Sequence, residues 1–146
     1  MGSSFTWYAE HGFWTRDSKI ALWLFVLCEE IDSGSDRPGW LLEARDEWRL
    51  HATEAFTGMV TANLDRFVGA DSDRVETLLA LSEDARSRLL AFGPVITGAD
   101  LNALPFDRHA VYSGDVEVDV FMPVADAWIR LLRGELTWDA KSSPVL

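Results

Sequence analysis

The chain has 146 residues, 48% of them hydrophobic, and a single cysteine. This length suits one domain with one core, so we expect a single globular domain over residues 1–146, while a lone cysteine excludes an internal disulfide and a multi-thiolate metal site. The formal net charge of −11 argues against binding to nucleic-acid phosphates or to an anionic membrane surface, and it favours a basic partner.

Nothing in the sequence directs the chain to a membrane. The N-terminal residues lack the basic start and the continuous apolar run of a secretory signal. The longest uninterrupted apolar run, residues 20–28, is too short to span a bilayer. We therefore expect a soluble, cytoplasmic protein.

The first sixteen residues mix aromatic side chains with Thr6 and Tyr8, and Gly12 interrupts them. Aromatic and β-branched residues favour extended backbone, whereas glycine weakens a strand. Residues 1–16 are therefore predicted to form an arm or a short strand whose aromatic face covers the core.

The stretch over residues 20–31 is apolar on every side of a helical wheel, and such a helix must be surrounded by other elements. Asp17 or Ser18 offers an N-cap, and Gly34 offers a left-handed stop. The sequence thus predicts a mainly α fold, a bundle of about four helices around a buried central helix over residues 17–33. Cys28 lies inside this helix and is expected to be inert.

A second helix is predicted over residues 40–67, because apolar residues recur at the helical period after Pro38. Gly58 is expected to bend or split it. A third helix is predicted after Asp71 or Ser72, ending before Gly93.

In the last third of the chain the spacing of the apolar residues changes. Thr97 opens a short helical turn, and valines then alternate with acids over residues 116–120. This alternation predicts a minor β-hairpin near residues 110–121 with its valines facing the core. A final helix begins at Pro123, and residues 135–146 are predicted to form a C-terminal tail.

Carboxylates gather at the end of the central helix, where the helix dipole is already negative. The pattern favours either a solvated acidic end neutralised by Arg37 or another arginine, or a surface kept for a cationic partner or metal ion. The start of the next helix continues the same surface. The predicted partner-binding residues are Glu29, Glu30, Asp32, Asp36, Trp40, Glu43 and Glu47.

One helix face carries possible metal ligands at a suitable spacing. Glu47, His51 and Glu54 are separated by four and three residues, which places their side chains on one side of a helix. The same pattern is typical of the solvated face of an amphipathic helix. A metal-dependent enzyme or metal-binding protein that uses these three residues is therefore an alternative function.

No motif specifies a reaction or a cofactor. The sequence contains no G-x-S-x-G elbow, no phosphate-binding loop and no dinucleotide fingerprint. No cofactor is predicted, and a non-enzymatic function is favoured over an enzymatic one.

The tryptophan content is high for a chain of this size and indicates either core packing or aromatic anchors on a surface. An acidic domain with such anchors suits an interaction protein that binds a basic protein partner, and bacterial immunity proteins that neutralise toxins share this profile. A second alternative is a helical protein with a tryptophan-lined pocket for a small ligand. The seven tryptophans are Trp7, Trp14, Trp23, Trp40, Trp48, Trp128 and Trp138.

Overall fold

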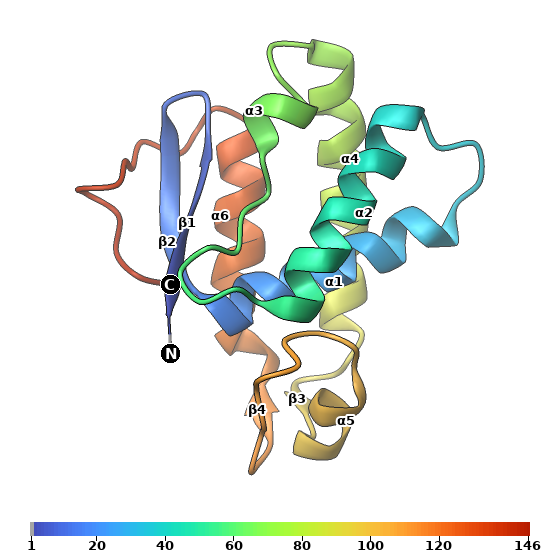
Figure 1. The fold of residues 1–146 in the computed structure, drawn as a ribbon, viewed down its shortest axis with the longest axis vertical. Helices are drawn as coiled ribbons and strands as arrows, with labels where there is room; N and C mark the ends of the chain where they lie inside the picture. Colours follow the sequence, from blue (N-terminus) through green and yellow to red (C-terminus); the bar gives the residue numbers. More distant parts are fainter. Residues whose placement is uncertain (1) are drawn as a thin grey trace.

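Helix α1 (Asp17–Ser33) lies at the centre of the computed structural model, which describes residues 2–146. It contacts α2 (Gly39–Glu54), α4 (Ser72–Leu90) and α6 (Met122–Leu132), as Figure 1 shows. All residues of the apolar run 20–28 are buried except Phe25, which is half-buried. The prediction of a mainly helical protein is confirmed.

The boundaries of α1 differ in detail from the prediction. Asp17 is the first helical residue rather than a cap, and its carboxylate accepts hydrogen bonds from outside the helix. At the other end Gly34 is not left-handed, since its φ is −102°. The Arg37 guanidinium instead closes this end by donating to the carbonyls of Ile31 and Glu30, at 3.1 and 3.2 Å. A Cβ at Gly34 would collide with that guanidinium, so glycine is needed for close approach.

The predicted helix over residues 40–67 is wrong in its second half. Helix α2 ends at Glu54 because Ala55 adopts a left-handed conformation with a φ of 42°. Residues 55–63 form a loop, and the helix α3 (Leu64–Phe67) follows it. Side chains distant in sequence hold the loop: Asp17 accepts from the Gly58 N–H and Ser4 accepts from the Val60 N–H, both at 2.9 Å.

The N-terminal segment forms two strands rather than an arm or a single strand. Strand β1 (Ser3–Tyr8) pairs antiparallel with β2 (His11–Arg16). In the turn between the strands, Ala9 and Glu10 have positive φ. Turns of this kind usually contain Asn, Asp or Gly, so these two residues do not predict it. Gly12 does not break the strand, because it allows close packing where a Cβ would collide with the Thr6 carbonyl.

Residues 135–146 dock along β2, outside the hairpin in Figure 1. The Gly12 N–H donates to the Trp138 carbonyl at 3.0 Å, and the Leu146 N–H donates to the Trp14 carbonyl at 2.8 Å. The Trp14 indole N–H adds a bond to the Ala140 carbonyl, also at 2.8 Å. The tail is therefore part of the folded structure.

The predicted hairpin near residues 110–121 is wrong. Strand β4 (Val116–Glu117) pairs instead with β3 (Val95–Ile96). The next residues turn into the short 3-10 helix η1 (Val118–Val120), because the Val118 N–H bonds to the Pro94 carbonyl. Val120 is consequently 40% exposed instead of buried.

Residues 95–120, which we term the acidic lobe, lie below the long helices in Figure 1. The lobe contains β3, α5 (Gly98–Ala103), β4 and η1. Thr97 caps α5 by accepting from the Asp100 N–H, as the sequence predicts. The cap of α4 is also as predicted, since the Asp71 carboxylate accepts from the N–H groups of Asp73 and Arg74.

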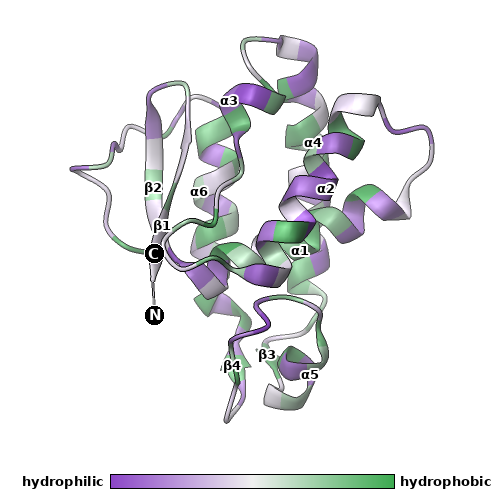
Figure 2. Cartoon of the chain, in the orientation of Figure 1, coloured by the Kyte–Doolittle hydropathy of each residue, from purple (hydrophilic) through white to green (hydrophobic). Residues whose placement is uncertain are grey.

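Three tryptophans fill the core beside α1. Trp128 lies edge-on to Trp23 and to Trp48, with ring centroids 6.2 and 5.8 Å apart. The Trp128 indole N–H donates to Ser82 Oγ at 2.9 Å, and that of Trp48 donates to the Ala62 carbonyl at 2.7 Å. Figure 2 shows hydrophobic colouring over much of α6, which carries Trp128. Across residues 2–146, no helix has the length and apolar character needed to cross a membrane.

Candidate functional site

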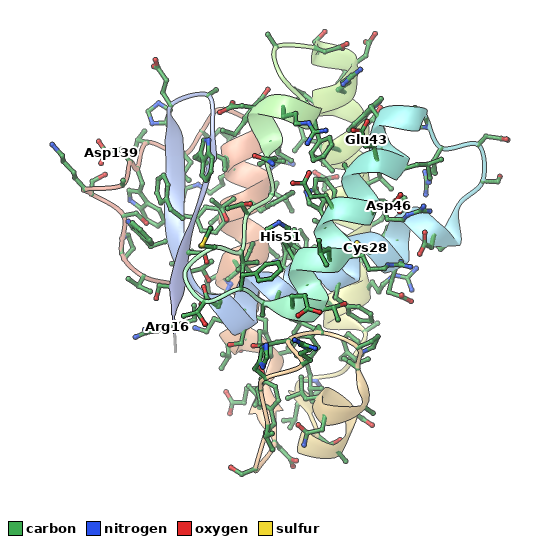
Figure 3. The ribbon with its side chains drawn as sticks, viewed as in Figure 1. Arg16, Cys28, Glu43, Asp46, His51 and Asp139 are labelled. Carbon is green, nitrogen blue, oxygen red and sulfur yellow. The ribbon has the colours of Figure 1, made fainter. Side chains whose placement is uncertain are left out.

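The seven residues predicted to bind a partner lie at the end of α1 and along α2, and we call them the α1–α2 face. Figure 3 shows Glu43 and Asp46 along the α2 side of this region. Asp32 is held by Arg45, at 3.0 Å, and by Arg49. Partial burial raises the pKa of Asp32, but the hydrogen bonds from the two arginines outweigh it and hold the pKa below its ordinary value.

Most other members of the α1–α2 face are also engaged within the chain. The ion pairs join Glu30 to Arg88 at 3.0 Å and Glu43 to Arg66 at 2.8 Å. The remaining contacts are the Asn63 amide on Glu47, at 2.9 Å, and the Arg74 guanidinium over the Trp40 ring, at 5.2 Å.

Glu29 and Asp36 are the exceptions on the α1–α2 face. Both are exposed, and neither has an ion pair among the residues that the structure describes. The internal ion pairs neutralise much of this face. A carboxylate paired within its own chain attracts a partner less strongly, so the face attracts a cationic partner less than its residue types suggest.

The proposed metal ligands do not converge on one point. His51 Nδ1 accepts a hydrogen bond from the Thr61 N–H at 3.3 Å. Glu54 forms an ion pair with Arg108 at 2.9 Å. Glu47 accepts a hydrogen bond from the Asn63 side-chain amide. Burial lowers the pKa of His51 against the raising effect of Glu47, so the imidazole is neutral near pH 7. Over residues 2–146, no three His, Cys, Asp or Glu side chains are arranged to hold a metal ion.

Cys28 lies in the core beside α2, with its Sγ 3.5 Å from the Arg45 carbonyl. Burial raises the pKa of the Cys28 thiol to about 12. We expect a disulfide reagent to leave Cys28 unmodified in the native protein at pH 8 and to modify it fully in denaturant, because the thiolate is the reactive form. A thiol assay with Ellman's reagent measures this, and rapid native labelling would contradict the buried placement.

The tryptophans do not line the main cleft. Trp23, Trp48 and Trp128 are buried in the core, and Trp7 is 38% exposed on β1. The cleft, of about 410 Å³, opens instead between the first turn of α1, the loop after α2 and the acidic lobe. Its lining residues are Gly2, Arg16, Asp17, Ser18, Ala55, Thr57, Asp107, His109, Ala110, Val111 and Tyr112.

Two sets of bonds fix the lobe side of this cleft. The Asp107 and Arg108 N–H groups donate to the carbonyls of Ala52 and Thr53, at 2.6 and 2.9 Å, and so close the end of α2. The Asn102 side chain makes hydrogen bonds to both the N–H and the carbonyl of Tyr112, at 2.8 and 2.9 Å. The positions of Asp107 and Tyr112 are thereby set by different elements.

The cleft wall contains two buried carboxylates, Asp17 and Asp107, which are 7% and 9% exposed. Asp17 accepts from the Ser4 hydroxyl at 2.5 Å and from the Gly58 N–H at 2.9 Å. Burial raises the pKa of Tyr112, the nearby Asp107 charge adds to this rise, and Ser18 opposes it. Tyr112 is therefore a neutral phenol at physiological pH.

Sequence reasoning missed the cleft and the surface of the acidic lobe. Val120, which the alternation predicted would face the core, is 40% exposed, and Val111 and Val95 are 86% and 44% exposed. One signal was readable from the sequence, since residues 95–120 contain five acidic residues and only one arginine. The segments that form the cleft are far apart in the chain, so no local pattern marks them.

Comparisons with protein-family models, with curated proteins and with solved structures found no match to this chain. Its function is therefore inferred from the geometry and charge of the molecule itself.

Proposed function

We propose that this protein is a non-enzymatic, acidic interaction protein that binds a basic protein partner. The observation that carries this proposal is the charge of the acidic lobe, which has five acidic residues and one arginine. That arginine, Arg108, pairs with Glu54 of α2, at 2.9 Å, and so offsets a charge outside the lobe. The exposed carboxylates of the lobe are Asp100, Asp115, Glu117 and Asp119.

The acidic lobe also offers apolar anchors. Val95, Val111 and Val120 are 44%, 86% and 40% exposed on the segment that carries these carboxylates. Interfaces commonly combine apolar contacts at the centre with charged groups that steer the approach of the partner. A basic surface with an apolar centre would complement both features of the lobe.

The α1–α2 face is the second surface on which the partner would bind. Its unpaired members, Glu29 and Asp36, add to the negative field, but most of its other carboxylates already have arginine partners. We therefore place the main contact on the acidic lobe and a supporting role on the α1–α2 face.

An immunity-type role is the form of this function that we favour. In it the protein would act in the bacterial cytoplasm and neutralise a basic toxin domain by covering its active surface. High negative charge supports this role, because fast electrostatic association protects a cell against a toxin.

Charge reversal tests the proposal. The partner is captured from cells of the source organism, purified, and titrated calorimetrically with the wild-type chain and with the triple variant Asp100→Lys, Glu117→Lys and Asp119→Lys. We expect the captured partner to be basic and its affinity to fall about 100-fold in the triple variant, because repulsion replaces attraction at three charges.

The matched control reverses Glu29 and Asp36 on the α1–α2 face, and we expect a loss of about tenfold or less. Affinity of the wild-type chain should also fall steeply with salt. Circular dichroism confirms that each variant is folded. An acidic partner, or equal binding by all three proteins, would overturn the proposal.

A further inference from the structure

We propose that the cleft between α1 and the acidic lobe binds a cationic group on an aliphatic stem, namely a guanidinium or an alkylammonium. The ligand is either a free amine or the end of an arginine or lysine side chain. The cleft has a volume of about 410 Å³, near the lower end of the range for small-molecule pockets, so it suits a ligand of this size. This inference does not depend on the proposed protein partner.

The Asp107 carboxylate is the main reason to expect a cation. Asp107 is only 9% exposed, and its Oδ1 accepts one long hydrogen bond, at 3.3 Å, from the His109 N–H. Among residues 2–146 its other oxygen receives no hydrogen bond. Asp107 lines the cleft, so a ligand there can supply the donor that this oxygen lacks, and a cationic donor does so best.

Asp17 adds a second negative charge to the cleft wall. Each of its oxygens already accepts one hydrogen bond, from Ser4 and from Gly58, and a carboxylate oxygen has room for another. Two carboxylates from α1 and the lobe thus line one cleft, together with the hydroxyl groups of Ser18 and Thr57. All of these groups can accept hydrogen bonds from a guanidinium.

The basic residues of the cleft do not reverse this preference. Arg16 is the one full positive charge in the lining, and its Nη1 donates to the Ser3 hydroxyl at 3.4 Å across the hairpin. His109 is exposed on the lobe. The two carboxylates, Asp17 and Asp107, outnumber the single guanidinium, so an anionic ligand is disfavoured.

The rest of the lining suits an aliphatic stem. Ala55, Ala110 and Val111 are apolar, and Tyr112 contributes an aromatic ring. Val111 is 86% exposed, so a stem packed on it would remove apolar surface from water. The Tyr112 ring also offers a cation–π contact to a guanidinium.

The test is a titration of the whole chain, followed by amide NMR signals and by calorimetry. One arm uses agmatine as the free amine, and a second uses N-acetyl-arginine amide as the side-chain source. The matched neutral probe is N-acetyl-citrulline amide, and inorganic phosphate is the anionic probe. We expect saturable shifts at residues 17–18, 57 and 107–112 with the two cations only.

The decisive variant is Asp107→Asn, which removes the charge and keeps the shape. Asparagine tolerates the positive φ of 37° at this position, so the variant should fold. We expect it to bind both cations about tenfold more weakly. The control is Asp84→Asn, which makes the same change at an exposed position on α4 and should bind as the wild type does.

Tighter binding of agmatine would support a free amine as the ligand, and tighter binding of the blocked arginine would support a side chain of a partner. Three results would overturn the inference. These are no saturable shift with either cation, equal binding by Asp107→Asn, or equal binding of citrulline or phosphate. None of these results bears on the charge reversal of Asp100, Glu117 and Asp119, so the two proposals fail independently.

Discussion

Replacing Trp128 by alanine is expected to lower the free energy of unfolding by about 3–5 kcal/mol. The Trp128 ring is fully buried and lies edge-on to Trp23 and Trp48, so its removal leaves a cavity in the middle of the core. The change also removes the indole donor to Ser82. Urea denaturation followed by circular dichroism at 222 nm measures the effect.

The matched control for this prediction is Trp7→Ala on the outer hairpin. Trp7 is 38% exposed and its ring stacks on Phe5 with centroids 6.4 Å apart, so its loss leaves no closed cavity. We expect a cost of about 1 kcal/mol or less. Equal costs for the two variants would show that the Trp128 cluster does not form the core.

Replacing Asp17 by alanine is the second change with a large expected effect, about 3 kcal/mol in the free energy of unfolding. The Asp17 carboxylate joins three segments, because it accepts from Ser4 on β1 and from Gly58 in the loop after α2 while it begins α1. Ser4 in turn accepts from the Val60 N–H at 2.9 Å. Removing the carboxylate leaves the buried Ser4 hydroxyl and the partly buried Gly58 N–H without their acceptor.

Urea denaturation gives the total cost of Asp17→Ala, and hydrogen exchange shows where it arises. We expect the Gly58 and Val60 amides to lose protection first, since the loop depends on this network. The control is Asp84→Ala, an exposed acid on α4, with a change within about 0.5 kcal/mol. A similar cost for both variants would mean that the network contributes no stability beyond ordinary surface charge.

The parts of the fold that the sequence predicts are those set by neighbouring residues. The all-round apolar character of residues 20–28 predicts their burial in α1, and Asp71 and Thr97 predict the starts of α4 and α5. Each of these signals acts within one or two helical turns. They need no knowledge of the rest of the chain.

The features that the sequence does not predict depend on distant contacts. Val116 and Glu117 alternate like half of a local hairpin, but their partners are Val95 and Ile96, about twenty residues earlier. The helical period continues past Ala55, yet the helix ends there because Asp17 and Ser4 bond to the loop that follows. Periodicity describes which side of an element is apolar and not which element it meets.

The candidate site shows the same division. The composition of residues 95–120 indicates an acidic surface, so this feature of the site can be predicted from the sequence alone. The pairing of Asp32 with Arg45 and Arg49 could not be read from the sequence, because arginines from α2 reach back to the end of α1. The cleft also had no local signal, since Asp17 and Asp107 are ninety residues apart.

The docked tail determines how the hairpin behaves toward other molecules. A two-stranded sheet has two open edges, and each offers backbone groups to any extended chain that approaches. Along β2 the N–H groups of Gly12 and Arg16 and the carbonyl of Trp14 already bond to residues of the tail. The β2 edge is thereby closed to pairing with a second copy of the chain, so the tail protects this edge from edge-to-edge aggregation.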